Sequence, residues 1–178
     1  GDMGGGMGQS SEDCLLQING GTLVIDAGGD GVDSNGNLEI NGGTVLVNGP
    51  GDGANSALDY EFSATVSGGT VLMVGAAGMG ESFTGGTQPF MSVMTNGQAG
   101  QTVSVVDAQG NVLVSLDAVK SFGQVLASTP EMTEGATYSV VVGDTTTEAT
   151  ASTTPSQTGG MGGMGGPGGG RGGMGRGM

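Results

Sequence analysis

Three segments repeat one pattern: INGGTLVID (Ile18–Asp26), INGGTVLVN (Ile40–Asn48) and VSGGTVLMV (Val66–Val74). In each, an apolar residue and an Asn or Ser precede Gly-Gly-Thr, and an apolar stretch follows. A period between about 20 and 30 residues, with short strands and turns at fixed offsets, is typical of a β-solenoid. Each unit would form one coil, stacked about 4.8 Å from the next.

The composition also favours an all-β fold, because Val, Thr, Ile and Leu fill the periodic segments and helix formers are scarce. A coil cannot bury its apolar side alone, so rows of these residues must stack in a shared core. We therefore predict a right-handed parallel β-helix of about three coils over residues 14–88. From 89 to 150 the pattern changes to four to six antiparallel strands, which predicts a C-terminal β cap that hides the core and the strand edge.

Both ends of the chain are low in complexity. Residues 1–13 and 151–178 are rich in Gly and Met, and neither stretch has the composition to bury a core. We expect disordered tails there. No run of 18 apolar residues occurs, so no membrane insertion is expected.

The charge balance excludes several partners and chemistries. The net charge is −14, with 17 acids against Lys120, Arg171 and Arg176. Nucleic acid is disfavoured as a partner, because phosphate binding requires Lys and Arg. With no His and one Cys, a transition-metal site and an internal disulfide are not expected. An acidic surface can still bind cations and, through them, acidic polymers.

The repeat aligns acids between coils. Asp30 and Asp52 each lie eight residues after a corner Thr, and Asp33 and Asp59 each lie eleven before the next one. Asp26 in coil one corresponds to Asn48 in coil two. Stacked carboxylates repel one another unless they are protonated or take a cation. Oxygen ligands without His or Cys select calcium.

The predicted calcium site combines the aligned acids with neighbouring amides, and Asn35 and Tyr60 are candidate ligand-binding residues beside it. The metal ligands are Asp26, Asp30, Asp33, Asn48, Asp52, Asn55 and Asp59. The alternatives are solvated turn acids, since Asp, Asn and Gly dominate turns, and a catalytic acid pair. A packing role for Tyr60 is an equal alternative. Phe62, Phe83 and Phe90 are expected in the core.

The stretch from INGGTLVIDAGGDGVDSNG to NSALDY, followed by VSGGTVLMVGAAGMGESF, TQPFMSV and the strands up to EGATYSVVVG, resembles a bacterial cell-surface family. This family consists of parallel β-helix carbohydrate-binding proteins of clostridia and their relatives, which resemble pectate lyases without lyase activity. Its members bind polysaccharides, including cellulose and acidic galacturonan, and carry calcium ions. The resemblance covers about residues 14–147. It implies calcium at Asp30, Asp33, Asp52, Asn55 and Asp59, with Tyr60 near a sugar surface. Full members have more coils, so it implies their C-terminal part.

The aligned acids predict calcium binding, and the resemblance implies an extracellular, non-catalytic protein that binds acidic or cellulosic polysaccharide. One alternative is a structural or adhesion module whose calcium only stabilises the fold. Another is a polysaccharide hydrolase, which the absence of Trp for sugar subsites disfavours.

Overall fold

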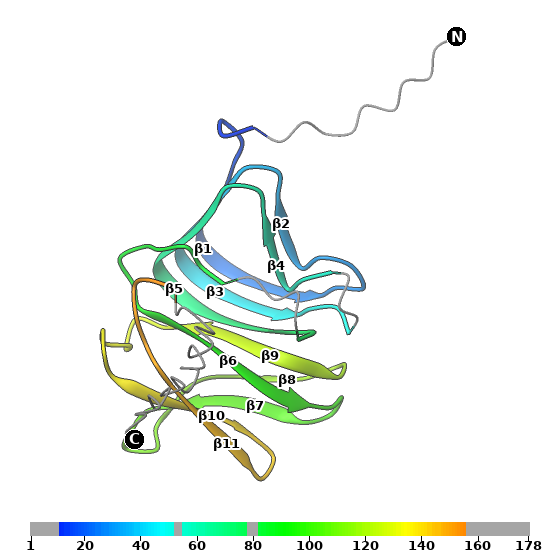
Figure 1. The fold of residues 1–178 in the computed structure, drawn as a ribbon, viewed down its shortest axis with the longest axis vertical. Helices are drawn as coiled ribbons and strands as arrows, with labels where there is room; N and C mark the ends of the chain where they lie inside the picture. The colour runs from blue at the N-terminus through cyan, green and yellow to red at the C-terminus, as the bar shows by residue number, and fades with distance from the viewer. Residues whose placement is uncertain (1–10, 52–54, 78–81, 156–178) are drawn as a thin grey trace, which may run out of the picture.

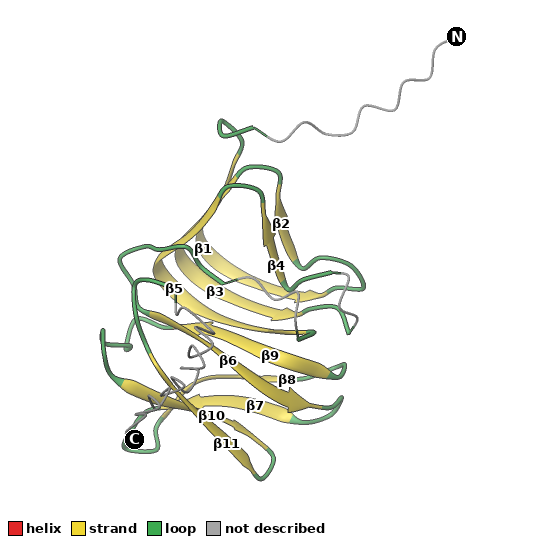
Figure 2. Cartoon of the chain, viewed as in Figure 1, coloured by secondary structure: helices red, strands yellow, loops and turns green. Residues whose placement is uncertain are grey.

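The computed structural model describes residues 11–51, 55–77 and 82–155, and within them it is all-β (Figure 2). This confirms the prediction of an all-β fold. In the described part of the chain, no helix is long and apolar enough to cross a membrane.

The largest sheet has five strands. Three long strands lie parallel and in sequence order: β1 (Leu15–Asp26), β3 (Asn37–Asn48) and β5 (Ser63–Gly75). The sheet then continues into β9 (Phe122–Ser128) and β6 (Phe90–Gly97), with β9 antiparallel to both β5 and β6 (Figure 1).

The predicted register of the repeats is confirmed, because Thr22 pairs with Thr44 and Thr44 pairs with Thr70. A register shift precedes each threonine, at the Gly-Gly corner. The second glycine of every corner has a positive φ, which is 86° at Gly43. Glycine adopts this conformation without steric cost, so the dipeptide bends each strand at the same place.

Two further sheets flank this one on opposite faces. The short parallel pair β2 (Val32–Ser34) and β4 (Leu58–Tyr60) lies on one side. An antiparallel sheet lies on the other, in the order β11 (Thr145–Thr150), β10 (Thr137–Val142), β7 (Thr102–Val106) and β8 (Val112–Asp117) (Figure 1).

Two cores follow from this layering. Alternate residues of a strand point to opposite faces, so Val71 and Met73 face the β2–β4 side, whereas Leu72 and Val74 face the antiparallel sheet. We call the core on the β2–β4 side the first core. It also contains Leu38, from the strand segment before a corner, and Val45, from the segment after it. The bent strands thus surround one apolar interior.

The antiparallel strands expected between residues 89 and 150 are present as β6 to β11. They share a sheet with the parallel strands, because β9 pairs directly with β5. Packing continues beyond the expected start of the tail, where Ala151 is fully buried and Ser152 pairs with Phe90. The remainder of both predicted tails, residues 1–10 and 156–178, lies outside the described residues.

Candidate functional site

Asp33 and Asp59 are neighbours on the two short parallel strands. Asp33 of β2 pairs in register with Asp59 of β4. In β2, Val32 and Ser34 are buried while Asp33 between them is exposed, because successive side chains point to opposite faces. Adjacent strands lie about 4.8 Å apart. The two carboxylates therefore line one outer face, as the repeat predicted.

Asp30 joins this face from the turn between β1 and β2. Its Oδ1 accepts a hydrogen bond of 2.9 Å from the main-chain N–H of Ser56, in the loop before β4. The main chain adds a second tie, since Gly31 N–H donates to the Ser56 carbonyl at 3.0 Å. Asp30 thus links the first repeat to the second. We call Asp30, Asp33 and Asp59 the acid face.

The negative charges of the acid face affect the pKa of one of its members. The pKa of Asp59 is raised above its ordinary value, first by partial burial and then by the negative charges of Asp30 and Asp33, although the Tyr60 N–H opposes this. Lys120 is the one basic residue between 11 and 155, and its ammonium group pairs with Asp26 instead. Within the described ranges, no cation offsets the three acids.

Asp26 and Asn48 pair in register as predicted, but their side chains hold the scaffold together. Lys120 Nζ lies 2.5 Å from Asp26 Oδ1 and donates to the Ala27 carbonyl at 2.5 Å. The Asn48 amide donates to the Asp117 carbonyl at 3.2 Å, and its Oδ1 accepts from Val119 N–H at 3.1 Å. Both residues fasten the parallel strands to the β8–β9 connection, a role that the metal prediction did not anticipate.

Three further predicted site residues remain. Asp52 lies outside the described residues. Asn55 is half-buried, in the loop before β4. Asn35 is exposed, and its main-chain carbonyl accepts a hydrogen bond from Ser11 N–H at 3.1 Å.

These positions allow a test of the predicted calcium site. Among the residues that the structure describes, no three Asp, Glu or Cys side chains form a group that could hold a metal ion. Asp30, Asp33 and Asp59 therefore do not make a preformed cage. Calcium remains a prediction, and an ion there would need further oxygen ligands from outside the three carboxylates.

Tyr60 packs against the first core, and its hydroxyl donates to the Ser82 carbonyl at 2.7 Å. Phe83 and Phe90 are buried as expected, in an edge-to-face contact with ring centroids 5.5 Å apart. The prediction for Phe62 was wrong, since its side chain is 41% exposed. Phe62 lies in the short turn between β4 and β5, beside Glu61. That polar neighbour was the signal that could have placed it at the surface.

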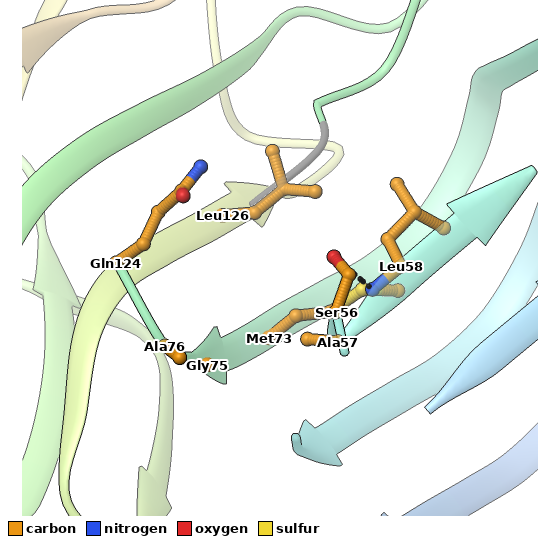
Figure 3. Close-up of a pocket in the computed structure, with 8 residues that line it drawn as sticks. All are labelled: Ser56, Ala57, Leu58, Met73, Gly75, Ala76, Gln124 and Leu126. Carbon is orange, nitrogen blue, oxygen red and sulfur yellow. Dashed lines mark hydrogen bonds between the residues drawn. The ribbon is translucent and has the colours of Figure 1, made fainter. Parts of the chain in front are cut away.

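A small cavity lies beneath the Ser56 turn, between β4, β5 and β9 (Figure 3). Ser56, Leu58, Met73 and Leu126 help to line it, and Ser56 Oγ accepts a hydrogen bond of 3.3 Å from Leu58 N–H. Its volume is about 10 Å³, which is space for about one water molecule and not for a sugar ring. This cavity therefore cannot hold a glycan; a larger and more open hollow of about 510 Å³ lies elsewhere, lined by residues that include Gln98, Gln101 and Phe122.

Comparisons with known proteins add no identity to this geometry. No protein-family model matches the chain, and neither a curated protein nor a solved structure matches it. The resemblance to the clostridial β-helix family therefore rests on the sequence motifs alone.

Proposed function

We propose that the chain is a non-catalytic polysaccharide-binding module of the bacterial cell surface, in which the acid face shares a calcium ion with an acidic glycan. The observation that carries this proposal is the in-register pair of Asp33 and Asp59, with Asp30 beside them. Two carboxylates on adjacent strands, without a nearby cation among the described residues, attract a divalent ion.

The incomplete ligand set agrees with a shared ion. Calcium takes six to eight oxygen ligands. Three carboxylates that do not form a cage leave coordination positions open, and uronate carboxylates of the glycan would fill them. Charge repulsion between an acidic protein and an acidic polymer would then be replaced by attraction through the ion. The exposed ring of Phe62, near the acid face in sequence, supplies apolar area for a sugar.

We further propose that the parallel strands belong to a right-handed parallel β-helix of about three coils. Support comes from the register, which repeats from β1 to β3 to β5 and from β2 to β4. In such a coil the acid face is a side wall, open to a long polymer.

The test is a binding titration with polygalacturonate, in excess calcium and then in chelator. We expect calcium-dependent binding that weakens by about tenfold or more in the Asp33→Asn/Asp59→Asn variant. The matched control is Asp144→Asn/Glu148→Gln, which also removes two negative charges but lies in the exposed β10–β11 hairpin. Affinity that does not respond to the chelator would refute the proposal.

The hydrogen bond of Tyr60 favours a second candidate function. The tyrosine ring and hydroxyl are both used in packing, as expected for a structural or adhesion module whose calcium only stabilises the fold. This candidate predicts calcium-dependent melting without glycan binding. Tyr60→Phe should cost about 1 kcal/mol of stability under either candidate, because it removes only the hydroxyl. Tyr60→Ala separates the two, since glycan affinity falls in it only if the ring contacts a sugar.

The proposal includes no catalytic role. A hydrolase that used the acids would release reducing ends from the polysaccharide, and Asp30→Asn or Asp52→Asn would abolish the release. Such a release would replace the binding function with an enzymatic one.

A further inference from the structure

Strand β1 is an open edge of the five-stranded sheet and lies at its outer end (Figure 1). It pairs with β3, and among the described strands none pairs with its other side. Leu16 and Leu23 are 37% and 38% exposed, whereas their in-register partners Leu38 and Val45 are fully buried. In a single copy of the described chain, the first core is thus uncovered at β1.

The β1 edge lacks the features that usually prevent association between sheet edges, which are charged residues, prolines and short strands. The strand is 12 residues long and contains no proline. Its one charged residue is the terminal Asp26, whose carboxylate pairs with Lys120. Leu15 and Val24 add apolar side chains that are 51% and 67% exposed. Such an edge is a template for pairing with another strand.

The apolar pattern of β1 is symmetric about its Gly20–Gly21 corner. Four β1 residues pair in register with β3 residues that are buried in the first core, and these are Leu16, Ile18, Leu23 and Ile25. Two of them precede the corner by two and four residues, and the other two follow it at the same spacing. The strand is therefore complementary to an antiparallel copy of itself, as a two-fold symmetric interface requires.

We infer that the β1 edge is the docking surface for the β1 edge of a second copy of this chain, which pairs with it in antiparallel fashion. A two-fold axis that bisects the corner places Leu16 opposite the partner's Ile25, and Ile18 opposite the partner's Leu23. Each inward-facing side chain then meets another, so the first cores of the two copies become continuous. Rotation about this axis leaves the direction of the bend unchanged, and the two corners therefore stack.

Other registers and arrangements fit this edge less well. A slip of one residue would place inward-facing side chains opposite outward-facing ones, and a slip of two would misalign the corners. A head-to-tail assembly would need the outer edge of β5, which β9 already covers. The two-fold dimer is closed, because each copy uses the edge at which its β1–β3–β5 stack is open.

Analytical ultracentrifugation and hydrogen exchange of the full chain, at increasing protein concentration, test this dimer. We expect a monomer in dilute solution, in which Leu16 and Leu23 keep their exposure, and a dimer at higher concentration. Exchange of the β1 amides should slow by about tenfold or more as the dimer forms. A chain that stays monomeric at every concentration, or that dimerises without protection of β1, would overturn the inference.

The substitution Leu23→Lys tests the apolar contact. It lowers the net negative charge of each copy, so added repulsion between acidic chains cannot explain a loss of binding. We expect it to weaken dimerisation by about tenfold or more. The matched control is Val112→Lys, at a 60% exposed site at the start of β8, which makes the same change of charge and should leave the dimer intact. Equal effects of the two substitutions would place the contact elsewhere and overturn the inference.

Disulfide formation between two variants measures the register, in a Cys14→Ser background. Gln17 lies opposite the partner's Val24 in the proposed dimer, and both sites are exposed in the single copy, so neither substitution opens the core. A mixture of Gln17→Cys and Val24→Cys chains should crosslink about tenfold faster than either variant alone, because a disulfide forms only between closely opposed residues. Non-reducing electrophoresis measures the rates. Equal rates in the mixture and in the single variants would contradict the antiparallel register.

Discussion

The side-chain amide of Asn48 bridges two peptide groups of the β8–β9 connection: it donates to the Asp117 carbonyl and accepts from the Val119 N–H, residues about 70 positions further along the chain. Asn48 is itself buried. This bond pair fixes the end of β3 against the strands that follow.

Removal of this amide should destabilise the fold. We expect Asn48→Ala to lower the free energy of unfolding by about 1–3 kcal/mol, because a buried donor and a buried acceptor lose their partner. Asn48→Asp keeps the acceptor for Val119 but places a carboxylate against the Asp117 carbonyl, so its deficit should shrink at low pH, where a protonated carboxyl can donate. Urea denaturation measures both. Asn41→Ala, at an exposed site, is the control; an equal loss there would contradict the assignment.

Thermal melting with and without calcium should distinguish the acid face from Asp26, whose carboxylate pairs with Lys120. With excess calcium against chelator, we expect the wild type to melt several degrees higher, and Asp33→Asn to lose that shift. Asp26→Asn should melt lower in both conditions, since it loses the ion pair with Lys120, and should keep the shift. Loss of the calcium response in Asp26→Asn, with retention in Asp33→Asn, would place the ion at the β8–β9 connection instead.

The raised pKa of Asp59 predicts a pH dependence of stability. The folded state binds this proton more tightly than the unfolded chain does, so ionisation of Asp59 costs stability. The cost is absent below the ordinary pKa of 3.8 and develops as the pH rises through the raised value. Asp59→Asn should therefore be more stable than the wild type at pH 7, by up to about 1 kcal/mol. The difference should vanish below about pH 4.

Urea denaturation at pH 7 and pH 3.5 tests this, with Asp144→Asn as a control for net charge. Calcium should remove the advantage of Asp59→Asn at pH 7, because it stabilises the wild type alone. A variant that is less stable than the wild type at pH 7 in chelator would contradict the raised pKa of Asp59.

Equivalent leucines on β1 and β3 should differ in their cost of truncation. Leu16 and Leu38 pair in register, but the first is 37% exposed and the second fully buried. We expect Leu38→Ala to cost about 2–5 kcal/mol, the range for a core leucine. Leu16→Ala should cost less than half as much, because less apolar area returns to water. Equal costs by urea denaturation would mean that β1 is covered in solution.

Much of the fold within the repeat could be predicted from sequence. The Gly-Gly-Thr corners fix the register of Thr22, Thr44 and Thr70, and the acid pair Asp33–Asp59 follows from the same offsets. These features depend on spacing along the chain, which a single sequence records directly.

Contacts between distant segments could not be predicted in this way. The pairing of β5 with β9 and the ion pair of Asp26 with Lys120 join segments that share no periodicity. For that reason the sequence did not predict that Asp26 and Asn48 contact the β8–β9 connection. The spacing of the repeats indicates which residues of neighbouring repeats lie side by side. It does not indicate which other segment of the chain packs against them.

The parallel strands keep their register although the first two repeats differ in length. Five residues separate β1 from β2, and nine separate β3 from β4, whereas two residues separate each short strand from the next long one. The four extra residues thus fall at one corner, where the acid face begins. A longer loop there costs only about 0.5 kcal/mol of closure entropy. Insertions at this corner could therefore change the surface beside the acid face, by evolution or by grafting, without disturbing the hydrogen-bonded ladder beneath.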